Sequence, residues 1–286
     1  MEAAKAIRYL GFTVMFAATL CTKWEGSLFF GWETKLLKAL LHVMNESDDP
    51  EAQEQAVLAM HNLGTECGDT LVEDADIFHS LLQLVQKGGT RSAEWNAAGV
   101  FYTALEGHPE RTDQKSPAEW GELLQALVQM LAEGAKEEKE GDPRGQEYGA
   151  LAILSLAQST QVASHMLRER KVLPAILTLF QEGSPDGKEY AARVLQLLAA
   201  VDIGALAFDK EKLVAAAAEV LKSGSRDAKK ETSKLIGQLC KKEHKYLKFE
   251  MDRAKIRCEE HSTASSLKLS LCTGLFLLVA WFQGGQ

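Results

Sequence analysis

The sequence predicts an all-α fold in which about five or six helical repeats stack into a right-handed superhelical solenoid. Three observations support this prediction. Apolar residues recur at helical three- and four-residue spacing along most of the 286-residue chain. Runs of valine, isoleucine and threonine alternating with polar residues, which would indicate strands, are scarce. The same helical pattern returns after about 41 residues, a period typical of stacked repeats.

The clearest copy of the repeat, Val172 to Ala199, is predicted to form two short helices joined by a tight turn. Each half places four apolar residues on one helical face: Leu173, Ile176, Leu177 and Phe180, then Ala191, Val194, Leu195 and Leu198. In the turn, we expect Gly183 to end the first helix in a left-handed conformation and Ser184 to cap the second, which starts at Pro185. One such hairpin cannot bury its apolar faces alone, so it needs neighbours.

The same eight-position apolar pattern occurs in four further helical pairs. They are Leu37, Leu40, Leu41 and Met44 with Ala56, Ala59, Met60 and Leu63; Phe78, Leu81, Leu82 and Val85 with Ala97, Val100, Phe101 and Ala104; Leu124, Leu127, Val128 and Leu131 with Gly149, Ala152, Ile153 and Leu156; and Val214, Ala217, Ala218 and Leu221 with Thr232, Leu235, Ile236 and Leu239. The turns NESDDPEA, KGGTRS and KSGSRD supply proline, glycine and capping side chains. We therefore predict repeats over residues 36–240.

The spacing of the copies indicates the class of repeat. Equivalent positions, which are Ala56, Ala97, Gly149, Ala191 and Thr232, lie 41, 52, 42 and 41 residues apart. The longest interval contains a charged insertion, Lys136 to Pro143, which we expect to be an exposed loop. Short pieces between copies, such as Gln161 to Arg170, would supply a small third helix in each unit. A period near 41 with two or three helices is the signature of armadillo or HEAT arrays.

Both ends of the chain differ from the repeats. Residues 1–35 are predicted to form N-terminal helices, either a partial repeat or a targeting segment, although the uncharged run from Tyr9 to Thr22 has only 14 residues. Residues 241–266 are predicted to form a charged helix and a linker. Residues 267–286 are hydrophobic, and the apolar stretch Leu269 to Phe282 predicts either a C-terminal membrane anchor or a helix that caps the solenoid.

Charge and cysteine content restrict the partners and the compartment. The net charge of −8 argues against nucleic acid as a partner. Residues 222–257 nevertheless carry twelve Lys and Arg against five Asp and Glu, so this segment could be a solvated helix face or could meet an acidic protein or an anionic membrane. Five scattered cysteines without a CxxC motif do not predict a disulfide framework. We therefore expect a cytoplasmic protein, with or without membrane attachment through its C-terminus.

Motifs that would indicate catalysis or cofactor binding are missing from the sequence. Neither the phosphate-binding GxxxxGK[ST] nor a GxGxxG after a strand occurs, and the seven histidines form no HExxH or zinc-finger spacing. Cys67 lies near Glu66 and Asp69, and adjacent carboxylates would raise the pKa of a thiol rather than activate it. The sequence therefore predicts a protein that is not an enzyme and has no cofactor or metal site.

Two stretches of the chain resemble armadillo repeats. They are QEQAVLAMHNLG, which runs from Gln53 to Gly64, and the hairpin from Val172 to Ala199, which is similar to the repeats of plant U-box armadillo proteins. The resemblance covers roughly residues 36–240. No U-box-like segment is visible, so the resemblance does not imply ubiquitin ligation.

The resemblance implies a concave binding surface along the last helix of each repeat. In peptide-binding members, an asparagine there bonds to the backbone of an extended peptide, and it corresponds to Asn62. The equivalent positions in later repeats are Thr103, Ser155, Leu197 and Gln238, of which three are polar. We therefore identify Asn62, Thr103, Ser155 and Gln238 as candidate partner-binding residues. The tryptophan of nuclear-import receptors is absent, since its positions hold Leu58, Gly99, Leu151, Arg193 and Lys234, so that function is not implied.

These observations favour a scaffold or adaptor that binds a partner protein on the concave face of a solenoid. Two alternatives remain open at this stage. A protein anchored through residues 269–282 would act mainly by recruiting partners to a membrane. A small armadillo co-chaperone would promote nucleotide exchange on a chaperone, for which the chain length is suitable.

Overall fold

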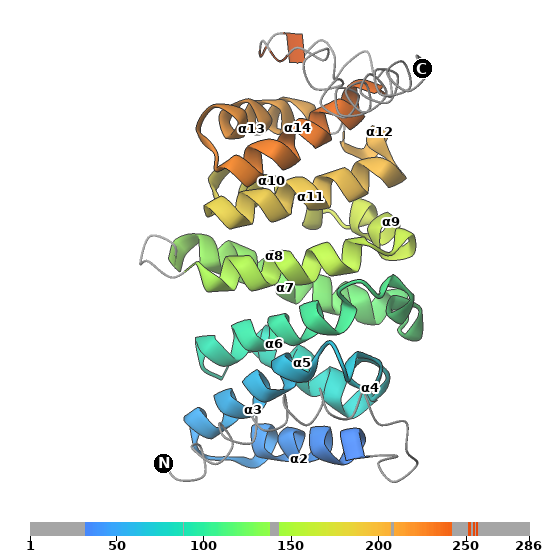
Figure 1. Ribbon diagram of the computed structural model, residues 1–286, viewed down its shortest axis with the longest axis vertical. Helices are drawn as coiled ribbons and strands as arrows, with labels where there is room; N and C mark the ends of the chain where they lie inside the picture. Colours follow the sequence, from blue (N-terminus) through green and yellow to red (C-terminus); the bar gives the residue numbers. More distant parts are fainter. Residues whose placement is uncertain are drawn as a thin grey trace, which may run out of the picture.

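The helices pack in two layers that follow one long axis, from α2 at one end to α13 and α14 at the other (Figure 1). The computed structural model describes residues 32–87, 89–137, 143–206, 209–241, 251–252, 254 and 256, and within these residues it contains helices and no strand. The predicted all-α architecture is therefore confirmed.

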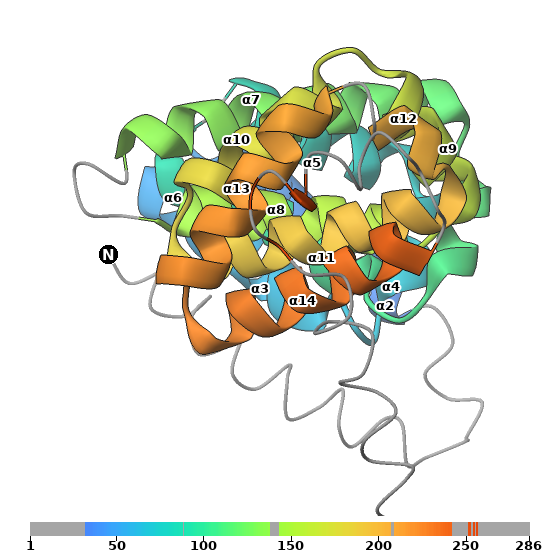
Figure 2. The same cartoon turned by 90° about the horizontal axis from the view of Figure 1, so that it is seen from above.

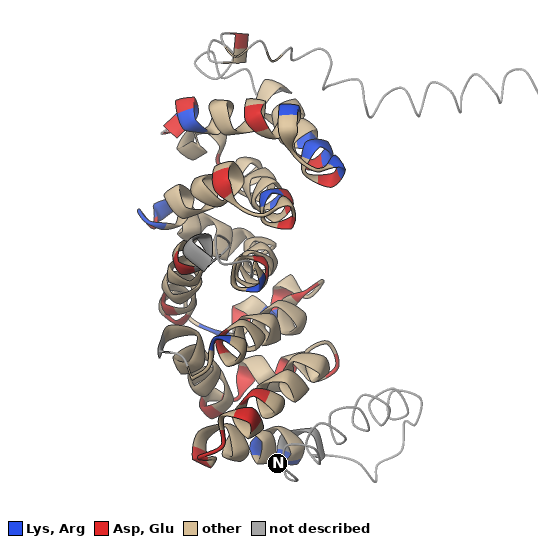
Figure 3. Cartoon of the chain, turned by 90° about the vertical axis from the view of Figure 1, so that its left-hand side faces the viewer, with Lys and Arg blue, Asp and Glu red and all other residues tan. Residues whose placement is uncertain are grey.

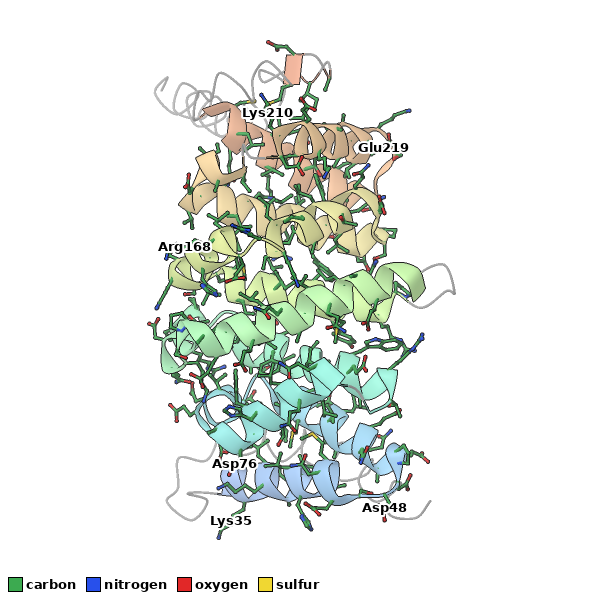
Figure 4. All side chains as sticks on the ribbon, turned by 180° about the vertical axis from the view of Figure 1, so that it is seen from behind. Lys35, Asp48, Asp76, Arg168, Lys210 and Glu219 are labelled. Carbon is green, nitrogen blue, oxygen red and sulfur yellow. The ribbon has the colours of Figure 1, made fainter. Side chains whose placement is uncertain are left out.

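Each predicted pair contributes one long helix to each layer. The inner layer consists of the second helices, α3 (Pro50–Leu63), α6 (Arg91–Leu105), α8 (Arg144–Ala157), α11 (Pro185–Val201) and α14 (Arg226–Lys241). The outer layer consists of the first helices, α2 (Trp32–Glu46), α5 (Ala75–Lys87), α7 (Pro117–Glu137), α10 (Val172–Glu182) and α13 (Lys210–Ser223). From behind, the outer layer carries charged side chains such as Lys35, Asp76 and Glu219 on its solvent side (Figure 4).

Short helices connect one pair to the next, as the sequence predicted. They are α4 (Gly68–Glu73), the 3₁₀ helix η1 (Pro109–Gln114), α9 (Thr160–Arg168) and α12 (Ile203–Leu206). Seen along the axis, α4, α9 and α12 gather at one edge of the two layers (Figure 2). The stretch Gln161 to Arg170, expected to supply a third helix, corresponds closely to α9.

A recurring side-chain cap starts the inner helices. Ser184 Oγ accepts a hydrogen bond of 3.0 Å from the backbone N–H of Gly187, and Pro185 occupies the first helical turn, as predicted. The same arrangement recurs before α3, α6 and α14, where the capping residues are Asp49, Thr90 and Ser225. The cap before α8 is different, because Pro143 provides no side-chain acceptor.

The prediction of a left-handed Gly183 was wrong. Its φ is −71° and its ψ is 173°, so the backbone leaves α10 in an extended conformation. A β-carbon there would lie 2.5 Å from the carbonyl oxygen of Leu179, so close backbone approach favours glycine at this position. Gly224, one repeat later, has the same extended geometry and the same close contact, with Val220.

The predicted apolar positions form one continuous core between the layers. All of them are buried except Leu41, Ala218 and Leu221, which are half-buried. The core extends without interruption from Leu37 on α2 to Ile256. Stacking of neighbouring repeats therefore buries the faces that a single hairpin would leave exposed.

An aromatic cluster joins the second and third repeats. The ring of Phe78 meets those of Phe101 and Trp120 edge to face, with centroids 5.4 and 5.5 Å apart. The indole N–H of Trp120 donates to the backbone oxygen of Thr112 at 2.7 Å, so this buried polar group is satisfied. These contacts connect α5, α6, η1 and α7.

Several sequence expectations concern residues outside the described part of the chain. These are the N-terminal segment up to residue 31, most of the charged insertion, and the hydrophobic stretch Leu269 to Phe282. Of the helices that the structure does describe, none combines the length and the apolar composition that crossing a membrane requires.

We predict that Phe78→Ala lowers the free energy of unfolding by about 3–5 kcal/mol, because it empties a fully buried aromatic site. Equilibrium urea unfolding of the full chain, followed by circular dichroism, measures the loss. Gln83→Ala, at an exposed position of the same helix, is the matched control and should change stability by less than about 0.5 kcal/mol. Similar losses in both variants would show that Phe78 does not anchor this repeat junction.

Candidate protein-binding surface

The inner layer offers a continuous surface that runs the length of the stack. Helices α3, α6, α8, α11 and α14 lie side by side, and each packs against the next. They face the viewer in Figure 1, and in the side view of Figure 3 they lie on the right, where the stack curves inward. We call the exposed and half-buried side chains of these five helices the inner surface.

Hydrogen bonds between repeats confirm that the helices are in register. They join neighbouring inner helices, as where Thr103 Oγ1 donates to the backbone oxygen of His61 at 3.1 Å, 42 residues apart. At the other end, Gln196 Nε2 on α11 donates to the backbone and carboxylate oxygens of Glu231 on α14, at 2.9 and 3.1 Å. Equivalent repeat positions therefore follow one another from helix to helix along the inner surface.

The four candidate residues from the sequence differ in exposure. Asn62 on α3 and Gln238 on α14 are exposed, whereas Thr103 is half-buried and Ser155 is only 1% exposed. Thr103 Oγ1 lies within 3.2 Å of the backbone oxygens of His61, Gly99 and Val100, which are alternative acceptors for its single proton, so only its acceptor capacity remains for a partner. The four residues do not form one cluster, because each lies on a different helix.

The sequence patterns did not single out three tyrosines in the middle of the inner surface. Tyr102, Tyr148 and Tyr190 are half-buried on the consecutive helices α6, α8 and α11. Tyr148 and Tyr190 occupy the same repeat position, 42 residues apart, and this coincidence was the available signal. Half-buried tyrosines are common in protein interfaces, because the ring supplies apolar area and the hydroxyl a hydrogen bond.

The local environment favours the protonated form of the hydroxyls of Tyr102 and Tyr190. Burial raises the pKa of Tyr102 to about 12, and a hydrogen bond and the charge of Glu106 contribute to the shift. Burial, followed by the charge of Asp186, also raises the pKa of Tyr190. The positive charge of Arg193 acts in the other direction and lowers the pKa of both tyrosines, but burial outweighs it. The hydroxyls of Tyr102 and Tyr190 are therefore hydrogen-bond donors at neutral pH.

His61 bridges three successive inner helices. Its ring, on α3, lies over Gly99 of α6, where a β-carbon would come within 2.8 Å of a ring carbon. The same ring meets Tyr148 of α8 edge to face, with centroids 5.3 Å apart. Burial lowers the pKa of His61, which a hydrogen bond with Asn96 partly opposes, and Nδ1 has no hydrogen-bond partner in the described part of the chain. Because Gly99 has no side chain, the ring of His61 can pack directly on α6. Because its pKa is lowered, His61 is neutral near pH 7.

The carboxylate of Glu231 on α14 is paired with Lys234 of the same helix and accepts a hydrogen bond from Gln196 of α11. Burial disfavours the ionised form of Glu231, but hydrogen bonds from Lys234 and Gln196 outweigh it and hold the pKa of this carboxyl below its usual range. Lys234 Nζ lies 2.7 Å from the carboxylate. Glu231 is therefore charged at neutral pH and links α11 to α14.

The described residues contain no group of three or more His, Cys, Asp or Glu side chains that could hold a metal ion. Cys67 is buried at the start of α4.

Comparison with known proteins shows the fold. No family model matches the chain, and a comparison with curated protein sequences found no match. Among solved structures, the chain is similar to a designed armadillo repeat protein in complex with peptide (KR)4, with a TM-score of 0.59 and 17% identity over 77% of this chain and 88% of that one. A second designed armadillo repeat protein gives a TM-score of 0.54 and 16% identity, over 72% and 85% of the two chains.

A natural protein, UNC-45 from Drosophila melanogaster, gives a TM-score of 0.55 and 14% identity. The match covers 88% of this chain and 35% of UNC-45, so the chain spans about a third of that protein. These likenesses confirm the predicted armadillo-type solenoid fold.

We predict that the stability of the fold decreases as the pH falls below about 6.5, the usual pKa of histidine. Because burial lowers the pKa of His61, the unfolded chain binds this proton more tightly, and acid therefore favours unfolding. Above this range His61 is neutral in both states and adds no pH dependence. Urea unfolding at a series of pH values measures the effect. His61→Gln should reduce the slope of unfolding free energy against pH, unlike Gln83→Ala at an exposed position of α5, and equal slopes in all three proteins would contradict the prediction.

Proposed function

We propose that this protein is a non-enzymatic scaffold or adaptor that holds a partner protein along its inner surface. The observation that carries the proposal is the separation of two kinds of position within each inner helix. The apolar positions are buried in the core, whereas the positions between them present polar and aromatic side chains at regular intervals. A surface built this way is repeated helix after helix, which suits an extended ligand better than a compact one.

The inner surface suits binding because its backbone is already ordered. The inner helices are fixed by caps, by the core and by hydrogen bonds between repeats. A partner therefore has to order only its own chain and a few side chains of the scaffold, which reduces the entropic cost of association. Many modest contacts, one or two per helix, can then add up to a useful affinity.

We assign the contacts to two groups of residues. Asn62 and Gln238 are exposed at the two ends of the inner surface, where their amides can both donate and accept hydrogen bonds. Tyr102, Tyr148 and Tyr190 supply the central area. Thr103 would contribute through its acceptor capacity alone, and Ser155 would act indirectly, by allowing close helix packing.

The known structures agree with this kind of function without defining the partner. One designed armadillo repeat protein was solved in complex with the peptide (KR)4. That peptide is a ligand of the designed protein. The kind of partner that this chain binds is inferred instead from the residues on the chain's own inner surface.

We predict that Asn62→Ala combined with Gln238→Ala weakens binding of a physiological partner about thirtyfold, because each of the two amides loses hydrogen bonds worth about 1 kcal/mol. Proximity labelling of the full chain in cells identifies the partner, and titration of the purified partner measures the affinity. The matched control is Gln83→Ala combined with Gln125→Ala, two exposed amides of the outer layer. The proposal would be overturned if the outer-layer variant lost as much affinity as the inner-layer variant, or if neither lost any.

A further inference from the structure

Charge is distributed unequally along the inner layer. Helix α3, the first inner helix, carries Glu51 and Glu54 and no Lys or Arg, a net charge of −2. Helix α14, the last, carries five Lys and Arg against two acids, a net charge of +3. In the helices between them, acids and bases balance. The basic end of the surface is visible on α14 at the upper right of Figure 3.

The cations of α14 form an exposed stripe. Arg226, Lys230 and Lys234 follow one another at four-residue spacing, which places them on one side of the helix, and all three are exposed. The exposed Gln238, already proposed as a contact residue, continues the stripe by one more turn. Although Lys234 is paired with Glu231, its side chain is still 52% exposed.

Helix α11 adds one exposed cation, Arg193, next to α14, although Glu189 lies one turn earlier on the same side of α11 and near Asp227. Arg193 is exposed and occupies the same repeat position as Lys234, 41 residues earlier. The bonds from Gln196 to Glu231 connect the two helices. In the three preceding repeats this position holds Leu58, Gly99 and Leu151, so its character changes from apolar to cationic towards the C-terminal end.

We infer that the C-terminal end of the inner surface, formed by Arg193, Arg226, Lys230 and Lys234, binds an acidic segment of the partner protein. This inference rests on the proposed function and specifies its chemistry. Carboxylates of an extended segment can pair with Arg193 on α11 and with the stripe on α14, because the two helices are adjacent and in register. Such complementary charge also speeds association and aligns the segment, with its acidic end at α14.

Two features favour a peptide segment over an anionic membrane. The cations belong to the inner layer, on the side where the stack curves inward, and a flat bilayer cannot follow that curvature (Figure 3). The acids of α3, Glu51 and Glu54, lie on the same layer and would repel an anionic bilayer that lay along the whole surface. A segment of a protein avoids both problems, because its acidic residues can be confined to one end.

The test uses the full chain and a fluorescein-labelled octaglutamate peptide, with an octalysine peptide for comparison, in a fluorescence anisotropy titration at low salt. We expect octaglutamate to bind more tightly than octalysine, with an affinity that decreases steeply as salt is added. Arg193→Glu combined with Lys230→Glu should weaken octaglutamate binding about tenfold.

The control variant changes the net charge by the same amount on the other layer. Lys212→Glu combined with Lys222→Glu reverses two exposed lysines of α13, and it should weaken octaglutamate binding by less than about twofold. Equal weakening by the two double variants would overturn the inference, because the peptide would then respond only to net charge. Circular dichroism confirms that each variant is folded.

A vesicle experiment distinguishes a membrane ligand from a peptide ligand. Sedimentation with vesicles of phosphatidylcholine and phosphatidylserine, in a ratio of about 3:1, tests the membrane. The inference would be overturned if Arg193→Glu combined with Lys230→Glu abolished vesicle binding and left octaglutamate binding unchanged. If partner binding depends on Asn62 and Gln238 but octaglutamate binding ignores the charge reversal, this inference fails and the proposed function stands. If octaglutamate binding depends on the charge reversal but partner binding does not depend on Asn62 and Gln238, the acidic-peptide site stands and the contacts assigned under the proposed function fail.

Discussion

The structure depends on one constraint, which is that no helical pair can bury its own apolar faces. Each pair therefore packs on the next, and the core becomes a continuous column from Leu37 to Ile256. The edge-to-face contacts of Phe78 show how such a junction is built, since a single side chain reaches rings on two other helices. Because the core lies between the layers, the side chains on the open side of the inner helices contribute little to stability and can serve recognition.

The repeat architecture was predictable because its signals are local. Apolar spacing, capping residues such as Ser184 and the return of the pattern after 41 or 42 residues can all be found without knowing any long-range contact. The conformation of Gly183 was not predictable in this way. Left-handed and extended exits from a helix both favour glycine, and the close approach of the Leu179 carbonyl oxygen becomes visible only in three dimensions.

The candidate site was predictable only in part, because exposure depends on neighbouring helices. Among the described inner helices, Asn62 and Gln238 lie on the first and the last, each of which packs against one other inner helix, and both residues are exposed. Ser155, at the same repeat position, lies on a helix flanked on both sides and is buried. The crossing of His61 over Gly99 to Tyr148 is likewise a contact between repeats, so it leaves no trace in the pattern of any single repeat.

The separation of core from surface also explains how an armadillo-type solenoid can change its partner without changing its fold. At one repeat position the chain holds Leu58, Gly99, Leu151, Arg193 and Lys234 in turn, from apolar to cationic, while the core positions beside them remain apolar or small. Each substitution at such a position alters the chemistry offered to a ligand at one point along the stack. For a segment bound as proposed, the order of the repeats would be the order in which the segment is recognised, and the uneven charge distribution between α3 and α14 would give the segment a preferred direction.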